Sequence, residues 1–109
     1  MTSDQEFPET TAESAIAAVT AGTPLVDVRE QHEWDAGHAP TAIFLPMSEL
    51  SGRLNELPDG EFLVMCHSGA RSARVTQVLV EQGYSPVNVA GGILAWHAAG
   101  GDVVPSASA

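Results

Sequence analysis

The sequence predicts one small doubly wound α/β domain, in which helices cover both sides of a parallel β-sheet. Short apolar runs alternate with helix-like segments along the chain, and no internal repeat or linker interrupts them. Two of these runs, residues 25–28 and 62–65, are apolar at nearly every position, which is typical of strands buried on both faces. With 109 residues, of which 44% are hydrophobic, the chain can bury one core. We expect an ordered domain at 10–100 between flexible segments at 1–9 and 101–109.

In the first half of the chain, helical segments are separated by two strands. Residues 10–13 fit a capping box, which starts a helix that Gly22 ends. Methionine and leucine at helical spacing predict a further helix over 47–57, although Gly52 weakens it. The other elements expected here are a short edge strand at 6–7, strands at 25–28 and 42–45, and a short helix or irregular connection at 29–37.

In the second half, a turn at 58–60 precedes the strand at 62–65. A helix with Val75 on its apolar face and Arg74 on its polar face then runs to Gly83. A strand at 86–89 and a last helix from the paired glycines to Trp96 complete the domain. Because ligands bind beyond the carboxyl ends of parallel strands, we expect the functional site where the strand at 62–65 ends.

The composition excludes several classes of protein. The net charge of −10, with four arginines and no lysine, would repel nucleic acid and anionic membranes, and we interpret it as an aid to solubility. No apolar run approaches the roughly 20 residues of a membrane span, and the acidic N-terminus is unlike a secretory signal. One cysteine with four scattered histidines makes a poor zinc site, so we expect no metal. A free thiol indicates a reducing compartment such as the cytoplasm.

The single cysteine, Cys66, lies between the strand at 62–65 and the following helix, in the run Cys-His-Ser-Gly-Ala-Arg-Ser. Backbone N–H groups converge at such a junction and stabilise an anion, so this thiol is expected to ionise easily. Gly69 allows the loop to turn its amides inward, and Arg71 offers donors to a bound anion or a brace for the loop carbonyls. The other side chains that can act at the rim are His67, Ser68 and Ser72. We interpret the loop as a nucleophilic cysteine in an anion-binding cradle.

Four blocks of the sequence resemble, in the same order, the motifs of the single-domain rhodaneses, a family of sulfurtransferases. Residues 25–30 (LVDVRE) resemble L-[IV]-D-V-R-[ED], and residues 33–42 (EWDAGHAPTA) resemble E-[FYW]-x-x-G-H-I-P-G-A. Residues 66–72 (CHSGARS) resemble the active-site loop C-x-[ST]-G-x-R-[SA], and residues 91–96 (GGILAW) resemble the closing G-G-x-x-A-W. Each block alone is a weak signal, but the four together are a strong one, and the resemblance extends over roughly 10–100.

This resemblance implies a doubly wound fold around about five parallel strands, and a two-step reaction. The Cys66 thiolate would take the outer sulfur of a donor such as thiosulfate, release sulfite and carry the sulfur as a persulfide. An acceptor, such as cyanide, a thiol or a sulfur-carrier protein, would then remove it. The groups expected to hold the sulfur are the amides of His67, Ser68, Gly69, Ala70, Arg71 and Ser72, with the Arg71 side chain. We expect no cofactor and a monomer or weak dimer.

Four residues outside the loop are candidates for supporting roles. For Asp27 and Arg29, which close a strand, we favour a structural ion pair, such as Arg29 with Glu33, over a role of Asp27 in orienting the loop. His38 could act as a general base, but we favour a structural hydrogen bond. We assign His32 and His97 to the surface, Trp34 and Trp96 to packing, and Arg74 to the polar face of its helix.

Two alternatives to a sulfurtransferase stay open. Related phosphatases and arsenate reductases have a loop one residue longer, C-x5-R, which surrounds a tetrahedral oxyanion. Here Arg71 follows Cys66 after four residues, and the smaller loop suits a single sulfur atom. A rhodanese module could also act without turnover, as a sulfur relay or as a partner-binding or redox-sensing domain. Such modules often lack the cysteine that this chain keeps.

Overall fold

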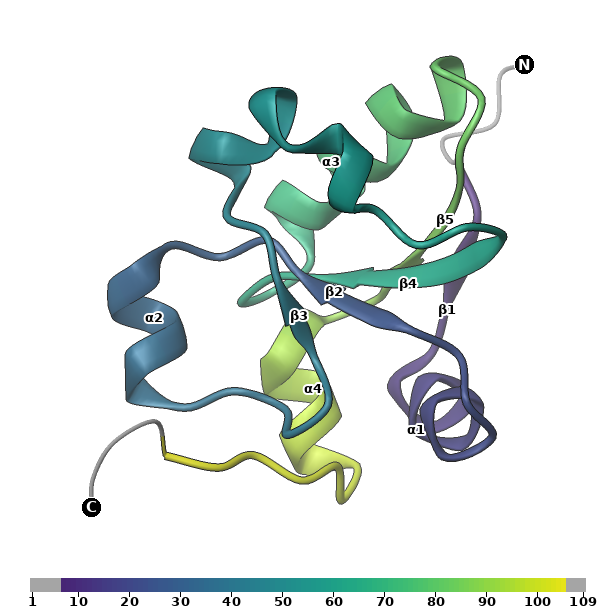
Figure 1. Cartoon of the computed structure of the whole chain (residues 1–109). Coiled ribbons are helices and arrows are strands. Elements are labelled where there is room, and N and C mark those ends of the chain that lie inside the picture. Colours follow the sequence, from purple (N-terminus) through teal and green to yellow (C-terminus); the bar gives the residue numbers. More distant parts are fainter. Residues whose placement is uncertain (1–6, 106–109) are drawn as a thin grey trace.

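The computed structural model describes residues 7–105, which form one parallel β-sheet of five strands (Figure 1). The strands lie in the order β1-β5-β4-β2-β3, so β4 is central, with β2 on one side and β5 on the other. Their bounds are β1 Glu9–Thr10, β2 Leu25–Asp27, β3 Ile43–Phe44, β4 Glu61–Met65 and β5 Ser85–Val89. This arrangement confirms the predicted doubly wound α/β fold.

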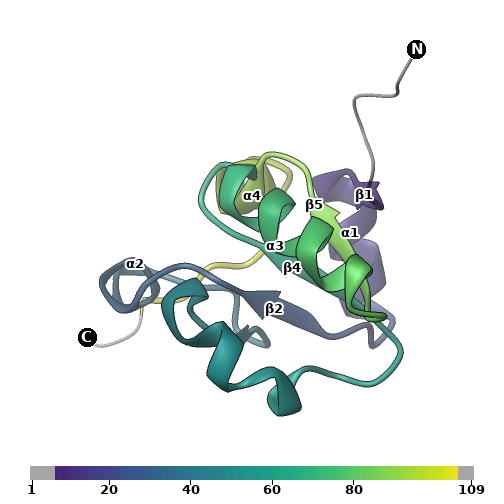
Figure 2. The same cartoon turned by 90° about the horizontal axis from the view of Figure 1, so that it is seen from above.

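Helices cover both faces of the sheet. In Figure 1, α1 (Ala12–Thr20) and α4 (Gly92–Ala98) lie below the strands, and α3 (Ala70–Glu81) lies above them. The short 3-10 helices η1 (Met47–Gly52) and η2 (Leu54–Glu56) share the upper face with α3 (Figure 2). The remaining helix, α2 (Gln31–Ala36), joins β2 to β3.

The central strand contributes side chains to two hydrophobic clusters, because successive side chains of a strand point to opposite faces. Phe62, Val64 and Cys66 belong to the cluster beneath α3 and the 3-10 helices. Leu63 and Met65 belong to the cluster beside α1 and α4. The helical partners include Leu50, Val75 and Leu79 in the first cluster, and Ala15, Ile93 and Trp96 in the second. Burial on both faces explains why this strand is a continuous apolar run.

The edge strand lies later in the chain than the sequence predicts. The prediction placed it at 6–7, but β1 begins two residues after Phe7, and Thr10 pairs with Val89 of β5. The residue before β1 is Pro8, which has no N–H group to donate but offers its carbonyl to the β5 amide of Asn88 at 2.9 Å. Pairing therefore starts at this proline, and the prediction was wrong in position.

Two helical segments also differ from their prediction. Residues 47–57 form the two 3-10 helices rather than one α-helix, because Gly52 is a poor helix former and Arg53, with φ −130°, leaves the helical region. The first helix, α1, has its N-cap at Thr11, whose hydroxyl accepts the Ser14 amide at 3.1 Å. The cap is thus one residue later than the predicted capping box.

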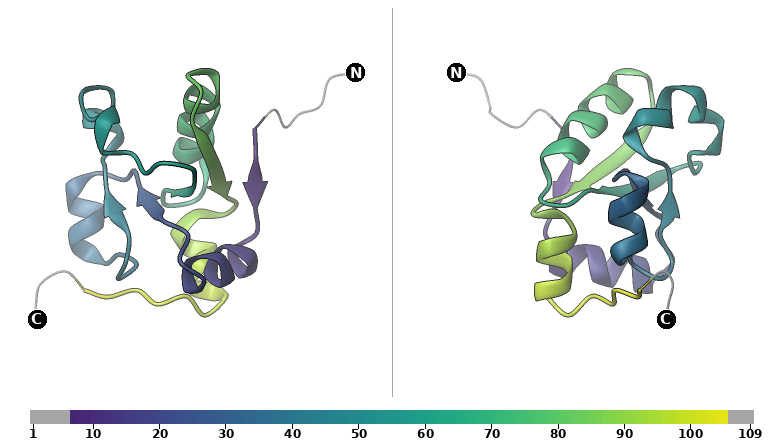
Figure 3. Two further views of the ribbon diagram at one scale, coloured as in Figure 1. Left: turned by 45° about the vertical axis from the view of Figure 1, so that its right-hand side comes forward. Right: turned by 90° about the vertical axis from the view of Figure 1, so that its left-hand side faces the viewer.

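Part of the expected C-terminal tail packs against the domain. His38 and Val104 exchange two backbone hydrogen bonds, of 3.0 and 2.8 Å, and Figure 3 shows this segment running from α4 back toward α2. Residues 1–6 and 106–109 lie outside the described residues, so their predicted flexibility stays a prediction. Among the helices of 7–105, none is both long and apolar enough to cross a membrane.

Candidate active site

The candidate site lies at the carboxyl edge of the sheet, where Cys66 follows β4 and α3 begins at Ala70. Backbone hydrogen bonds connect the neighbouring chain segments at this edge. The amide of Val28 donates to the carbonyl of Met65 at 3.0 Å, and the amide of Met47 donates to the carbonyl of Val28 at 2.9 Å. The cysteine is therefore held at the end of the central strand, which is where ligands bind in such sheets.

The sulfur of Cys66 is surrounded by donors from the loop and the first turn of α3. The amides of Gly69 and Ser72 donate to Sγ, with N···S distances of 3.2 and 3.3 Å. The hydroxyl of Ser72 lies 3.4 Å from Sγ and also 3.4 Å from the Gly69 carbonyl, so its one proton has two acceptors. Cys66 is only 1% exposed, which leaves little solvent to compete with these bonds.

Burial and hydrogen bonding act on the pKa of Cys66 in opposite directions. Burial raises this pKa, because a charged sulfur loses its hydration. The Ser72 hydroxyl and the amides of Ser72, Gly69 and Arg71 outweigh burial, and the pKa of the thiol falls below its ordinary value. The loop therefore favours the thiolate, which is the nucleophilic form of cysteine.

The loop residues proposed from the sequence contribute unequally. Of their six amides, those of Gly69, Arg71 and Ser72 interact with the sulfur. His67, Ser68 and Ala70 are exposed, and the contacts of the described residues include no bond from them to Sγ. They form the outer surface of the loop.

The N-terminus of α4 holds the same loop from the opposite side. The amide of Ile93 donates to the carbonyl of Cys66 at 2.8 Å, and the amide of Leu94 donates to the carbonyl of His67 at 3.2 Å. Gly92 makes this approach possible, since a Cβ there would lie 2.4 to 2.5 Å from carbonyl atoms of Cys66 and His67. The start of α4 thus fixes the backbone of the two residues at the beginning of the loop, one of which is Cys66.

This contact is a functional feature that sequence reasoning missed. The paired glycines Gly91 and Gly92 are visible in the sequence, where they indicate only a turn into the last helix. In the fold, Gly69 also packs here, because its hypothetical Cβ would lie 3.0 Å from the Gly91 nitrogen. Two adjacent glycines before a helix were the available signal for close backbone packing.

Arg71 is bound to α2 through its side chain. Its two terminal nitrogens each donate to one oxygen of Glu33, at 2.7 Å, so the pair is bidentate. These bonds lower the pKa of Glu33 to about 2, although burial opposes them. The pair joins α2 to the start of α3, and it occupies the guanidinium face that a bound anion would otherwise use.

Arg29 forms a separate, buried ion pair with Asp27, which corrects the expected pairing with Glu33. The guanidinium donates to both Asp27 oxygens, with the shortest distance 2.8 Å, and both side chains are at most 5% exposed. Arg29 reaches Glu33 only through the backbone carbonyl, at 3.3 Å, and also donates to the carbonyl of Gly37 at 2.8 Å. The carboxylate of Glu33 is left for Arg71.

The aromatic and histidine residues near α2 pack together. Nδ1 of His38 lies 3.0 Å from the Trp34 carbonyl, and the rings of His38 and Trp34 stack at 3.7 Å between centroids. Trp34 also stacks on Phe44, whereas Trp96 lies in the core cluster beside α1. His32 and His97 are exposed. Within residues 7–105, no three His, Cys, Asp or Glu side chains are grouped as metal ligands would be.

A buried cysteine sulfur, held by helix-start amides at the central strand of a doubly wound sheet, defines a class of α/β domains with a nucleophilic cysteine loop. Within this class, the chain belongs to the Rhodanese-like domain family, whose pattern matches residues 11–99.

Comparison with known proteins gives similar relatives over most of the chain. The chain is 42% identical over 81 residues to a protein named sulfurtransferase from Allochromatium vinosum, covering 72% of this chain and 76% of that protein. It is 41% identical over 74 residues to YtwF of Bacillus subtilis, named as a candidate sulfurtransferase, covering 67% and 72%. The crystal structure of a rhodanese-related protein from Thermoplasma volcanium superimposes with a TM-score of 0.82 at 31% identity, covering 92% of this chain and all of that chain.

Proposed function

We propose that this protein is a sulfurtransferase that moves a sulfane sulfur from a donor such as thiosulfate to a thiophilic acceptor through a persulfide on Cys66. The observation that carries the proposal is the set of donors around Sγ, from the amides of Gly69 and Ser72 and the Ser72 hydroxyl. These groups favour the thiolate needed for attack, and the family relationship supports sulfur as its target.

In the first step, the thiolate attacks the outer sulfur of thiosulfate. A new S–S bond forms, the S–S bond of the donor breaks, and sulfite leaves with the bonding electrons. The enzyme then carries a persulfide anion, and the loop amides are oriented to stabilise its charge without reorganisation. In the second step, cyanide, a thiol or a sulfur-carrier protein attacks the terminal sulfur, and Cys66 leaves as the thiolate.

The size of the site supports sulfur rather than phosphate as the group bound. Cys66 is 1% exposed, and its sulfur needs to contact only the outer sulfur of thiosulfate, whereas attack on phosphate would have to reach the central phosphorus between its oxygens. Phosphate is bound best by an arginine whose fork of donors is free. Here both terminal nitrogens of Arg71 are already bound to Glu33.

We further propose that the reaction needs no metal or cofactor, since the Cys66 thiolate is the nucleophile of the first step and the acceptor is the nucleophile of the second. A functional free thiol favours a reducing compartment, so we place the protein in the cytoplasm. A monomer or weak dimer fits a small domain of net charge −10, because like charges oppose close association.

The test is the mass of the intact protein after incubation with thiosulfate. The wild type is expected to gain the mass of one sulfur atom, to lose it when cyanide is added, and to release thiocyanate. Cys66→Ser should fold normally, because the two side chains have nearly the same size, and should gain nothing. A Cys66→Ser protein that still loads sulfur would contradict the mechanism. A wild type that no thiosulfate or organic persulfide loads would contradict the function.

A further inference from the structure

The helix α2 carries Glu33 to the cysteine loop, but none of its own side chains is buried. Its six residues are too few to form a stable helix alone, so α2 depends on contacts with the rest of the domain. Trp34 is partly buried and stacks on Phe44, and hydrogen bonds at both ends of the helix add to this contact. The place of Glu33, and with it the bidentate pair to Arg71, therefore depends on what holds the two ends of α2.

The C-terminal end of α2 is held by two separate sets of contacts. In the first, Nη2 of the buried Arg29 donates to the carbonyl of Gly37 at 2.8 Å. In the second, His38 exchanges two backbone hydrogen bonds with Val104, of 3.0 and 2.8 Å. Val103 packs directly on the glycine, since a Cβ at Gly37 would lie 3.1 Å from Cγ1 of Val103. Residues from the far end of the described chain thus bind the segment that follows α2.

The same segment, residues 101–104, is anchored at its other end to α4, and we call it the strap. The amide of Gly101 donates to the carbonyl of Trp96 at 2.8 Å, and Nε1 of Trp96 donates to the carbonyl of Asp102 at 2.9 Å. Figure 3 shows the strap, in yellow, running from the end of α4 toward α2. Because Trp96 is only 3% exposed, this end of the strap is fixed to the core.

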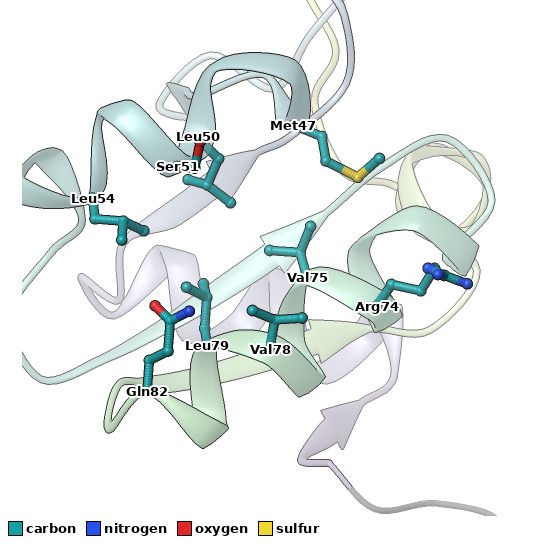
Figure 4. A pocket seen from close by; sticks show the side chains of 9 residues that line it. All are labelled: Met47, Leu50, Ser51, Leu54, Arg74, Val75, Val78, Leu79 and Gln82. Carbon is teal, nitrogen blue, oxygen red and sulfur yellow. The ribbon is translucent and has the colours of Figure 1, made fainter.

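The strap, α2 and the cysteine loop border one hollow, which has a volume of about 320 Å³. Val103 lines it from the strap, Glu33 from α2 and His67 from the loop. By contrast, the apolar groove between α3 and the 3-10 helices, which Arg74 helps to line, has no lining residue from the loop, α2 or the strap (Figure 4). The strap lies after residues 11–99, which the family pattern matches, so the four motifs do not predict its contacts.

We propose that the strap is a positioning element of the active site, which holds α2 against the cysteine loop and so keeps Arg71 bound to Glu33. Val104 is the positioning residue, because its amide and carbonyl bind the segment after α2. The donors to the sulfur of Cys66 come from the loop and α3, so the strap acts on it only through α2. This inference rests on the proposed function only where sulfur loading is measured.

The first test removes one hydrogen bond of the strap and measures the ion pair. In Val104→Pro, the proline has no N–H group to donate to the carbonyl of His38. NMR measures how fast the guanidinium protons of Arg71 exchange with water, and this exchange should be about two- to tenfold faster than in the wild type, the range for one lost hydrogen bond. Glu33→Gln gives the limit for a broken ion pair. The matched control is Val104→Ala, which keeps both backbone bonds and should exchange like the wild type.

A second measurement follows Cys66 in the same variants. Thiolate absorbance should show a higher pKa of Cys66 in Val104→Pro, and sulfur loading from thiosulfate at pH 7 should be about two- to fivefold slower. Loading should recover at higher pH, which a general loss of stability would not produce. In the double variant Val104→Pro/Glu33→Gln, the proline should add nothing to the effect of Glu33→Gln on this pKa, because both changes act through the same ion pair.

Val103→Ala is the second variant, in case the proline variant does not fold. It loses the contact with Gly37 but keeps both bonds to His38, and it should change Arg71 exchange in the same direction by a smaller factor. Arg71 exchange and a Cys66 titration equal to those of the wild type, in folded Val104→Pro or otherwise in Val103→Ala, would overturn the proposal. Failure of the wild type to load sulfur would count against the proposed function instead, and Arg71 exchange would still decide the role of the strap.

Discussion

The starts of α3 and α4 are built alike but act on different parts of the same loop. Each begins after a glycine with positive φ, 105° at Gly69 and 80° at Gly91. The first turn of α3 directs the amide of Ser72 at the sulfur, whereas the first turn of α4 directs the amide of Ile93 at the carbonyl of Cys66. The unpaired N–H groups of a helix start can thus stabilise a reactive anion or fix a backbone, depending on which acceptor is placed before them.

The largest expected effect comes from disrupting the contact between the start of α4 and the cysteine loop. In Gly92→Ala, the new Cβ would meet the carbonyls of Cys66 and His67, and alanine would adopt an unfavourable φ of 59°. Left-handed strain of about 1–2 kcal/mol and overpacking of about 1–3 kcal/mol predict a loss of about 2–5 kcal/mol in the free energy of unfolding. Urea denaturation measures this loss, and we expect sulfur loading to disappear with it.

Gly60→Ala is the control that separates backbone strain from the steric clash of the new Cβ. Gly60 has a φ of 74° but no atom within 4 Å of its hypothetical Cβ. It should therefore show only the strain, about 1–2 kcal/mol, and keep its sulfur loading. Equal destabilisation in the two variants would mean that α4 does not need its close approach to the loop.

A smaller effect is expected when the start of α3 loses its ion pair with Glu33. Glu33→Gln replaces the bidentate ion pair with Arg71 by a neutral contact, which should lower the free energy of unfolding by about 1–3 kcal/mol. It should also raise the pKa of Cys66, because the Arg71 amide is then less firmly placed. Because Arg71 lowers the pKa of Glu33 to about 2, the stabilisation is complete above its ordinary pKa of 4.5 and is lost as pH falls toward 2. Denaturation at a series of pH values should show this loss in the wild type and not in Glu33→Gln.

The control for this variant is Glu56→Gln, which disturbs the exposed pair with Arg53. Exposed ion pairs contribute little, so stability and the pKa of Cys66 should stay close to wild type. If Glu33→Gln behaved the same way, Arg71 would not need its carboxylate partner to hold the loop.

The two helix starts also differ in how well the sequence predicts them. The α3 start is local: a buried apolar run, a cysteine, a glycine and a helical pattern follow one another, so the cradle can be placed from neighbours alone. The α4 start is not local, since Gly92 contacts a loop that lies more than twenty residues earlier in the chain. The Arg71–Glu33 pair spans 38 residues, and nothing local favours it over a pairing of Glu33 with Arg29, which is four residues away but binds Asp27 in the fold.

The fold shows the same division between local and distant information. Strands buried on both faces, such as β4, are predicted well because their composition alone identifies them. The edge strand β1 is two residues long and is defined by its pairing with β5, so its position could not be read from its own residues. The segment around Gly52 has helical spacing, but a local break divides it into two 3-10 helices.

The smallest expected effect comes from removing one donor on the α3 side. In Ser72→Ala the hydroxyl 3.4 Å from Sγ is lost, but the amides of residues 69 and 72 stay in place. The pKa of Cys66 should rise, and sulfur uptake from thiosulfate at pH 7 should slow by about two- to fivefold, as expected for one weak hydrogen bond. Raising the pH should restore the rate, because the thiolate then forms without the hydroxyl. Thiolate absorbance near 240 nm, measured against Cys66→Ser, follows the titration directly.

The control is Ser68→Ala, which removes an exposed hydroxyl of the same loop and should leave both the titration and the rate unchanged. An unaltered titration in Ser72→Ala would mean that its hydroxyl proton is given to the carbonyl of Gly69, and that the amides of the helix start hold the sulfur alone.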